Sequence, residues 1–384
     1  MSNTELQTST LSGVEGHLKE IDNQGLPSGW KECKLGDVIT LQRGHDLPKT
    51  KMKEGIYPVA GSNGIIGYHN EYTTNEKGIT IGRSGNIGNP KFYNCNFWAH
   101  NTVLYIKDFK GNDEKFIFYF LNNIDFSGLN SGSAVPTLNR NYVHETNISL
   151  PPLPEQKAIA EILSSFDDKI DLLHQQNKTL EDMAQTLFRE WFVEKTDERW
   201  GEGKLNDEFD FIMGVSPKGD TFNSDKTGTP MFQGNADFNF RFPSNRIYTN
   251  DPKKFADKYD TLISVRAPVG AQNMAKEKCC IGRGLASFKY KKCYEFYTYT
   301  YYKMMSLMTE IKSFNNNGTV FGSISKSEFN NIDVVIPNIE AIERFEETAK
   351  PINDKIIQNE EQIKTLEQTR DTLLPKLMSG EVRV

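Results

Sequence analysis

Arginine and amide side chains lie in glycine-rich turns in two separate stretches of the chain. The turn "ITIGRSGNIG" spans residues 79–88 and the turn "TLISVRAPVG" spans residues 261–270, so each contains one arginine, Arg83 or Arg266. Arginine binds guanine edges and phosphates through paired hydrogen bonds, and Asn and Gln bind adenine edges in the same way. These residue types suit the reading of bases more than catalysis.

Ten polar side chains in or beside such turns are candidates for contact with DNA, because a backbone rich in glycine can approach a surface closely. Each of them taken singly is equally compatible with an ordinary solvated side chain. Only the parallel placement of Arg83 and Arg266 sets those two apart. The candidates are Arg43, Arg83, Asn86, Lys91 and Arg140 in the first stretch and Arg266, Gln272, Asn273, Arg283 and Lys326 in the second.

Several enzyme motifs are missing from the sequence. "GVSPKGDT" has the glycines of a phosphate loop but carries Asp220 in place of the lysine, and neither HExxH nor the Asn-Pro-Pro-aromatic tetrapeptide of adenine methyltransferases occurs. Residues 155–157, "EQK", resemble part of a nuclease motif, but a place in the first turn of a helix favours a role in capping and solubility. The five cysteines lack metal-ligand spacing and predict free thiols in a reducing cytoplasm. No catalytic residue and no metal site is predicted.

The two stretches are each followed by a copy of one helix pattern. "LPPLPEQKAIAEILSSFDDKI" (150–170) and "IPNIEAIERFEETAKPINDKI" (336–356) align without a gap at an offset of 186 residues. In both copies one face recurs every three or four residues, which predicts two amphipathic helices. The residues of this helix-pair seam are Ile159, Phe166, Ile170, Leu173, Asn177, Leu180 and Leu187 in the first copy and Ile352, Ile356, Asn359, Ile363, Leu366, Leu373 and Leu377 in the second.

The repeated seam predicts that the helices pack on each other, and the short link 193–203 favours an antiparallel pair. Antiparallel layers share a constant sum of residue numbers, and the sum that matches Ile159 with Leu377 also matches Asn177 with Asn359. A buried pair of asparagines can fix register. Asn338 is the expected N-cap of the second helix. Pro351 is expected to kink that helix or to move its start to about residue 351.

Charge and composition divide the chain into alternating blocks. The net charge is +2 for residues 30–147 and +3 for residues 201–333, but −5 and −3 for residues 148–200 and 334–384. Short β-branched runs between Gly, Pro and Asn predict compact, β-rich mixed domains in the two basic blocks. We therefore expect a polar tail (1–29), a first domain (30–147), a spacer helix (148–197), a second domain (198–333) and a second spacer helix (334–384).

The segment "LPPLPEQKAIAEILSSFDDKIDLLHQQNKTLEDMAQTLFREWFVE" (150–194) and the C-terminal "LEQTRDTLLPKLMSGEVRV" (366–384) resemble the conserved regions of the DNA specificity subunit of Type I restriction-modification systems. The resemblance extends over the chain after residue 29. Residues 338–341 depart from the usual Pro-Leu-Glu-Gln-type opening of the second copy. The resemblance implies an α+β fold in which two β-rich target recognition domains are separated by an antiparallel helix pair with pseudo-two-fold symmetry.

The same resemblance implies a non-catalytic, cytoplasmic subunit in which each recognition domain reads one half of a bipartite asymmetric site in double-stranded DNA. It implies that the helices set the gap and dock two methylation subunits, which use S-adenosylmethionine, and that restriction subunits use ATP with Mg. No cofactor is expected on this chain. Two alternatives stay open on the residues alone: a coiled-coil protein whose domains bind protein or glycan, and an active methyltransferase.

Overall fold

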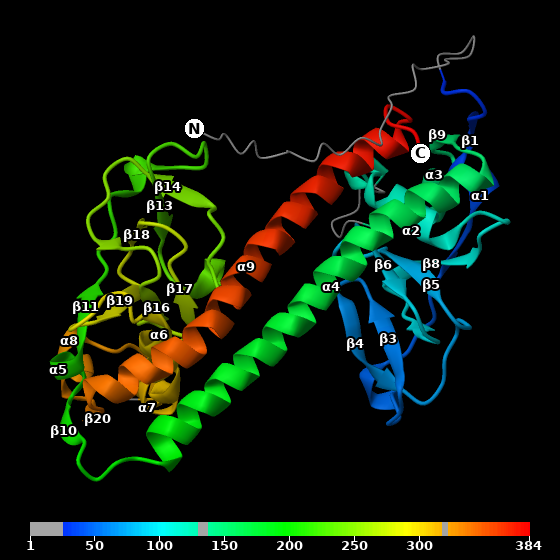
Figure 1. Ribbon diagram of the computed structural model, residues 1–384. Coiled ribbons are helices and arrows are strands. Elements are labelled where there is room, and N and C mark those ends of the chain that lie inside the picture. The colour runs from blue at the N-terminus through cyan, green and yellow to red at the C-terminus, as the bar shows by residue number, and fades with distance from the viewer. Residues whose placement is uncertain (1–25, 130–136, 317–321) are drawn as a thin grey trace, which may run out of the picture. The chain divides into compact units, whose positions relative to one another are not determined.

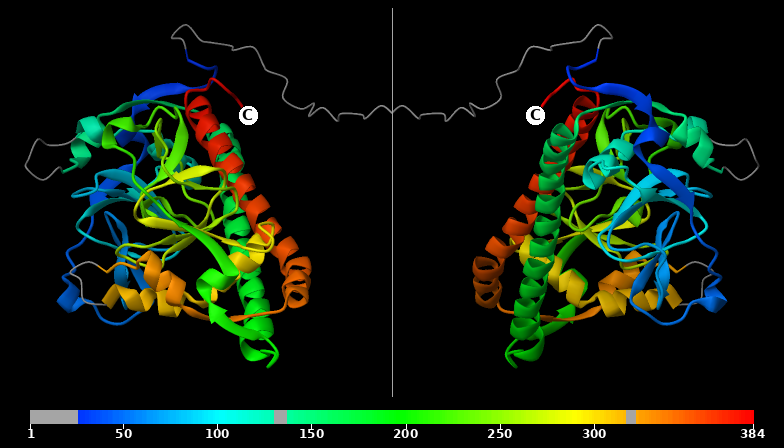
Figure 2. Two further views of the ribbon diagram at one scale, coloured as in Figure 1. Left: turned by 90° about the vertical axis from the view of Figure 1, so that its left-hand side faces the viewer. Right: turned by 90° about the vertical axis from the view of Figure 1, so that its right-hand side faces the viewer.

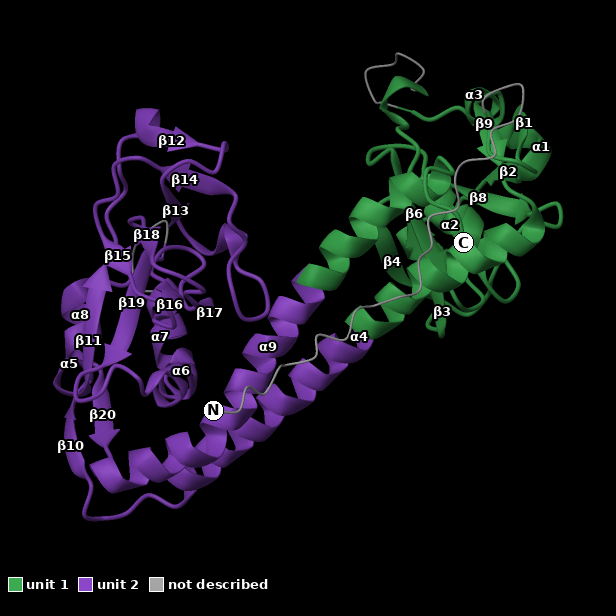
Figure 3. Ribbon diagram, turned by 45° about the horizontal axis from the view of Figure 1, so that its top comes forward, with its two compact units in different colours: residues 1–170, 365–384 green, residues 171–364 purple. Residues whose placement is uncertain are grey.

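The structure is a computed structural model that describes residues 26–129, 137–316 and 322–384. The predicted tail lies outside the described residues up to residue 25, as do parts of the small-residue turns at 132–143 and 318–329. The chain forms two compact units, residues 1–170 with 365–384, and residues 171–364 (Figure 3). Each of two long helices contributes one part to each unit.

The first unit is built on a four-stranded antiparallel sheet in the order β2-β8-β5-β6 (Figure 1). A second sheet, β4-β3-β7, pairs β3 with β7 in parallel at Ala60 and Ala99. Strands β1 and β9 form a separate antiparallel pair. The elements are β1 Lys31–Lys34, α1 Leu35–Val38, β2 Thr40–Arg43, β3 Tyr57–Gly61, β4 Gly64–His69, β5 Gly78–Gly82, β6 Gly88–Tyr93, β7 Trp98–Ala99, β8 Val103–Asp108, α2 Glu114–Asn122, α3 Arg140–His144 and β9 Asn147–Leu150, with 3-10 turns at Lys49–Lys51 and Ser127–Leu129.

The second unit repeats this arrangement with a larger second sheet. Its four-stranded sheet has the order β11-β19-β16-β17, its second sheet the order β12-β14-β13-β18-β15, and β10 pairs with β20. The elements are β10 Gly201–Lys204, α5 Leu205–Glu208, β11 Phe209–Met213, β12 Phe222–Asn223, β13 Thr229–Phe232, β14 Ile247–Thr249, β15 Phe255–Ala256, β16 Thr261–Ser264, β17 Gln272–Met274, β18 Cys279–Ile281, β19 Leu285–Tyr290, α6 Tyr297–Ser306, α7 Met308–Ser313, α8 Lys326–Asn331 and β20 Asp333–Ile336, with 3-10 turns at Gly219–Thr221, Asn235–Asp237 and Phe314–Asn316.

In each unit the four-stranded sheet packs its apolar side chains against one helix of its own domain and against the spacer helices. In the first unit α2 begins at its N-cap Asp113, whose side chain accepts from Phe116 N at 2.8 Å, and it buries Phe116 and Leu121. In the second unit α6 buries Tyr299, which lies among Phe188, Phe192 and Phe345 of the spacer segments. Burial of these large side chains is the main stabilising term for both cores.

The two spacer helices are α4 (Leu153–Arg189), which continues as a π-helical turn over Glu190–Glu194, and α9 (Ile339–Met378). They lie side by side in Figure 1 and in both views of Figure 2. At the start of α9, Asn338 Oδ1 accepts from Ala341 N at 3.0 Å, which confirms the predicted N-cap. None of the described helices is long and apolar enough to cross a membrane.

Pro351 neither ends nor restarts α9, so the prediction of a start at about residue 351 is wrong. Proline in a helix interior removes one backbone hydrogen bond and costs about 3 kcal/mol. The turns before it are held by the N-cap and by buried Ile342, Phe345 and Ala349. Packing on the second domain outweighs the local preference.

The predicted register of the helix pair is confirmed within the second unit. Asn359 Nδ2 donates to Asn177 Oδ1 at 2.8 Å, and both side chains are buried. The helices therefore run antiparallel with the constant sum expected from the seam. None of the predicted seam residues is exposed, and six of them are half-buried. The other eight are buried: Ile159, Ile170, Leu173, Asn177, Ile356, Asn359, Ile363 and Leu377.

Candidate nucleic-acid interface

The two four-stranded sheets place the candidate residues on equivalent strands. In the first unit, Gly44 N donates to the carbonyl of Val103, the first residue of β8, at 3.0 Å. In the second unit, Gly214 N donates to the carbonyl of Leu285, the first residue of β19, at 2.8 Å. A Cβ added at Gly44 or at Gly214 would lie 2.1 or 2.2 Å from a backbone oxygen, so the same close approach demands glycine at both positions.

This framework corrects the predicted match between Arg83 and Arg266. Arg83 donates its backbone N–H to the carbonyl that precedes β8, at 2.8 Å. The residue that makes the equivalent bond before β19, also at 2.8 Å, is Val265. Arg266 therefore corresponds to Ser84, and both form isolated bridges to equivalent segments. Aligning the two turns by their arginines pairs Arg83 with Arg266, but the backbone hydrogen bonds pair Arg83 with the residue before Arg266.

Two arginines of the first unit come close together at one end of its sheet. Arg43, at the end of β2, lies 3.4 Å from Asp46 Oδ1, and Asn101 Nδ2 donates to the same oxygen. Arg83 Nη1 donates to Asn101 O at 3.4 Å. Burial and, after it, the positive charge of Arg43 lower the pKa of Arg83. Arg43 thus pairs with the carboxylate of Asp46, whereas Arg83 contacts a backbone carbonyl, an arrangement that leaves positive charge for a phosphate or a guanine edge.

The second unit places different side chains on the same backbone positions. Counted from the shared hydrogen bonds, Met213 stands where the first unit has Arg43, Ser216 where it has Asp46, and Arg283 where it has Asn101. Arg283 N donates to Ser216 Oγ at 3.2 Å. Arg283 and Arg266 are both exposed. Positive charge is therefore present at this end of both sheets, but it comes from residues that are not equivalent.

Two residues predicted to contact DNA make side-chain hydrogen bonds inside the second unit instead. Asn273 is fully buried on β17, and its Nδ2 donates to Asn239 O at 2.7 Å. Gln272 is half-buried, and its Nε2 donates to Tyr301 O at 2.7 Å. The prediction that Asn273 contacts DNA is wrong, and the Gln272 amide N–H group is already engaged. Both residues lie on β17, whose side chains are buried or half-buried. The glycine-rich turns beside this strand gave no sign of that burial.

The four other candidates are exposed on turns, a strand edge or helix starts. Arg140 and Lys326 are the first residues of α3 and α8, which follow the N-caps Asn139 and Ser325. They are equivalent and both basic. Lys91 lies on β6 opposite Thr80, and Asn86 lies in the turn before β6. That these residues contact DNA stays a prediction.

Glu155 has a structural role that the sequence did not predict. Instead of being a solvated cap, its carboxylate is buried and accepts from Trp30 Nε1 at 3.2 Å. Arg383 Nε and Nη2 donate to its two oxygens at 3.0 and 2.8 Å. The pattern around "EQK" gave no sign of these partners because both lie more than 100 residues away. Glu155 holds both ends of the described first unit to the start of α4.

Comparison with known proteins gives a consistent result. The sequence profile of the family described as Type I restriction modification DNA specificity domain matches residues 27–182 and 197–368. A Methanocaldococcus jannaschii protein provisionally named as the MjaX type I restriction enzyme specificity subunit is 34% identical over 264 residues, which cover 65% of this chain and 62% of the relative. The specificity subunit of the type I restriction enzyme MjaIX from the same organism is 26% identical over 96% of this chain and 97% of its own length.

Among solved structures, the S subunit of a Type-I restriction-modification system from M. genitalium matches with a TM-score of 0.64 at 20% sequence identity. The match covers 94% of this chain and 98% of that chain, so the two share their fold. With the duplicated domain, the helix pair and two profile matches that together cover most of its length, the chain belongs to the Type I restriction modification DNA specificity domain family.

Proposed function

We propose that this protein is the DNA specificity subunit of a Type I restriction-modification complex. Each recognition domain reads one half of a bipartite, asymmetric site in double-stranded DNA. The observation that carries the proposal is the duplicated sheet framework with different side chains at equivalent positions, where half-buried Asn101 and Ser84 in the first unit correspond to exposed Arg283 and Arg266 in the second. One shared scaffold with two different surfaces fits two half-sites of different sequence.

In this proposal the spacer helices set the number of base pairs between the half-sites and dock two methylation subunits. The chain itself carries no catalytic residue and no cofactor. S-adenosylmethionine belongs to the methylation subunits, and ATP with Mg to the restriction subunits, in the cytoplasm. The support for these partners is membership of the family together with the acidic surface of the helices, which suits protein more than DNA.

Salt-dependent binding to duplex DNA tests the proposal. The complex of this chain with its methylation partner should lose affinity steeply between 50 and 200 mM salt, by about a thousandfold or more if six or more phosphates are contacted. The binding should also depend on the identity of bases in both half-sites. Binding that is absent, or that does not change with salt, would instead favour the alternative in which the two domains bind protein or glycan. S-adenosylmethionine binding by the isolated chain would favour an active methyltransferase.

A further inference from the structure

The second recognition domain carries a loop that has no counterpart in the first. Strands β13 and β14 are joined by residues 233–246, whereas the equivalent strands β3 and β4 are joined by residues 62–63. The equivalence rests on the parallel pairing of β13 with β18 and of β3 with β7. The long loop is anchored on the four-stranded sheet, because Arg241 O accepts from Met274 N at 3.0 Å and Asn239 O accepts from Asn273 Nδ2 at 2.7 Å.

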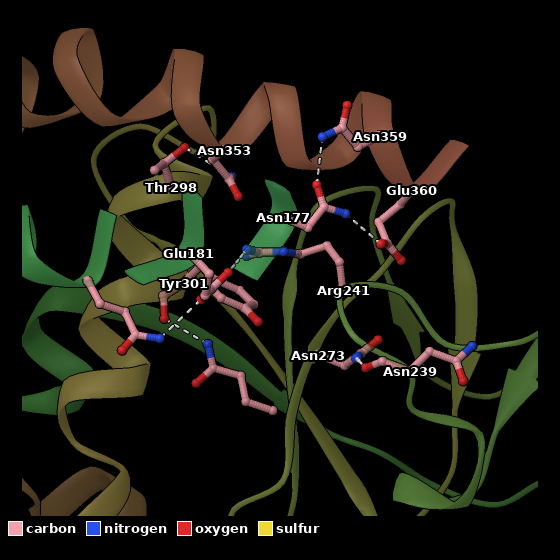
Figure 4. Close-up of polar contacts among 12 residues, drawn as sticks. Asn177, Glu181, Asn239, Arg241, Asn273, Thr298, Tyr301, Asn353, Asn359 and Glu360 are labelled. Atoms are coloured by element: carbon pink, nitrogen blue, oxygen red, sulfur yellow. Dashed lines mark hydrogen bonds and ion pairs between the residues drawn. The ribbon is translucent and has the colours of Figure 1, made fainter. Parts of the chain in front are cut away.

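Arg241 turns from this loop toward the spacer helix α4, as Figure 4 shows. Its side chain is fully buried, and Nη2 donates to Glu181 Oε2 of α4. Its guanidinium carbon lies 4.1 Å from the centre of the Tyr301 ring. Among the described residues, Nε and Nη1 of Arg241 have no hydrogen-bond partner. A buried positive charge therefore depends on a single carboxylate and on aromatic faces, the nearer of Tyr301 and the more distant of Phe240 at 5.9 Å, which makes the contact sensitive to the loss of Glu181.

The pKa of Glu181, on the helix side of the ion pair, depends on burial and on Arg241. Burial raises the pKa of Glu181, and the charge of Arg241 opposes that rise. The neighbouring layer of α4 holds Asn177, which contacts Asn359 and Glu360 of α9 (Figure 4). The loop is thus attached where the register of the helix pair is itself fixed by polar contacts.

The first unit attaches its domain to the helices differently. Tyr119 of α2 donates its hydroxyl to Asp167 Oδ2 of α4 at 2.5 Å, and Asp167 pairs with Arg370 of α9. Here the arginine belongs to a spacer helix, and the domain contributes a neutral hydroxyl to this pair. Within residues 26–129, 137–316 and 322–384, the fully buried arginine of a recognition domain that pairs with a spacer helix is that of the second unit.

We propose that Arg241 is a positioning residue whose ion pair with Glu181 holds the second recognition domain at one place on α4 and so narrows the gap lengths that the protein accepts between half-sites. This inference rests on the proposed function, since it needs a bipartite site. Neighbouring gap lengths differ by about 3.4 Å along DNA. A shift of about 1 Å in a reacting group can change a rate by about a hundredfold. A domain that is held firmly on α4 therefore distinguishes between gap lengths that differ by one base pair better than a domain that can move.

The test uses the complex of the full chain with its methylation partner and duplexes that carry the natural gap or a gap one base pair longer or shorter. For Arg241→Met we expect the ratio of kcat/KM between natural and altered gaps to fall about tenfold, with the base preference of both half-sites unchanged. Glu181→Gln should act in the same direction. Arg241→Lys, which keeps the charge, should restore part of the discrimination.

Arg246→Met is the matched control, because Arg246 lies on the same loop with a side chain that is 62% exposed and pairs with Asp237 at 2.8 Å. It should keep the gap preference of the parent protein. The inference is overturned if Arg241→Met and Glu181→Gln both fold and retain that preference, or if Arg246→Met lowers it equally. If Arg241→Met does not fold, the gap preferences of Glu181→Gln and Arg241→Lys decide between the two outcomes. A parent complex without any gap preference would refute the proposed function instead.

Discussion

Removal of the asparagine side chain at the centre of the helix pair should destabilise the protein by a predictable amount. Asn359 Nδ2 donates to Asn177 Oδ1 and to Gln176 Oε1, both at 2.8 Å, and Asn359 is fully buried. The bond to exposed Gln176 contributes about 1 kcal/mol net, and loss of the bond to Asn177 leaves Oδ1 buried without this donor, at a cost of about 1–3 kcal/mol. Asn359→Ala should therefore lower the free energy of unfolding by about 2–4 kcal/mol.

The double variant Asn177→Leu with Asn359→Leu separates hydrogen bonding from packing. Replacing both partners removes the unpaired group, so this variant should be at least about 1 kcal/mol more stable than the sum of the single changes predicts. Because the polar pair fixes register, the double variant should also allow helix pairings that the parent excludes. Urea unfolding followed by circular dichroism at 222 nm measures the first effect.

The control is Gln358→Leu, the exposed neighbour on α9, which should change the unfolding free energy by less than about 0.5 kcal/mol. The reasoning is refuted if Asn359→Ala costs no more than Gln358→Leu. It is equally refuted if the effects of the two leucine substitutions simply add.

Three further changes have defined outcomes. Burial raises the pKa of Glu346 from 4.5 to about 7, so its contribution to stability is full below pH 4.5 and is lost as the pH rises through 7. Glu346→Gln should therefore raise the unfolding free energy at pH 8 by about 3 kcal/mol at most. The control, Glu347→Gln at an exposed position, should change the unfolding free energy at pH 8 by less than about 0.5 kcal/mol. Arg266→Ala should reduce base discrimination by about 1–3 kcal/mol in one half-site only, and equal loss in both would contradict the division between the domains. Four residues inserted within 171–190 add about 6 Å of helix and should lengthen the accepted gap by about one or two base pairs; an unchanged gap would mean that the helix does not set it.

The helix pair could be predicted from the sequence because its signal is periodic. The apolar spacing, the offset between copies and the two asparagines each point to the same antiparallel register, and the contact between Asn177 and Asn359 agrees with it. Of the two effects predicted for Pro351, the new helix start was wrong, because a local preference says nothing of the buried side chains, such as Phe345, that hold the preceding turns. The predicted kink stays a prediction.

The candidate interface was less predictable because it depends on contacts between distant residues. The correspondence of Arg83 with Val265 follows from backbone hydrogen bonds that no match of letters contains. Arg241 carries no sequence signal at all, since its partner Glu181 lies 60 residues earlier on a helix. Exposed Arg and Lys residues beside glycines could be found, but whether an amide such as that of Asn273 faces inward could not.

The most direct measurement is the sequencing of methylated bases in DNA from cells that contain this protein together with its methylation partner. The account predicts one methylated motif with two different half-sites and a fixed gap, and a change in only one half when one recognition domain is replaced. A continuous or palindromic motif would contradict it, as would methylation that is the same in cells without this chain.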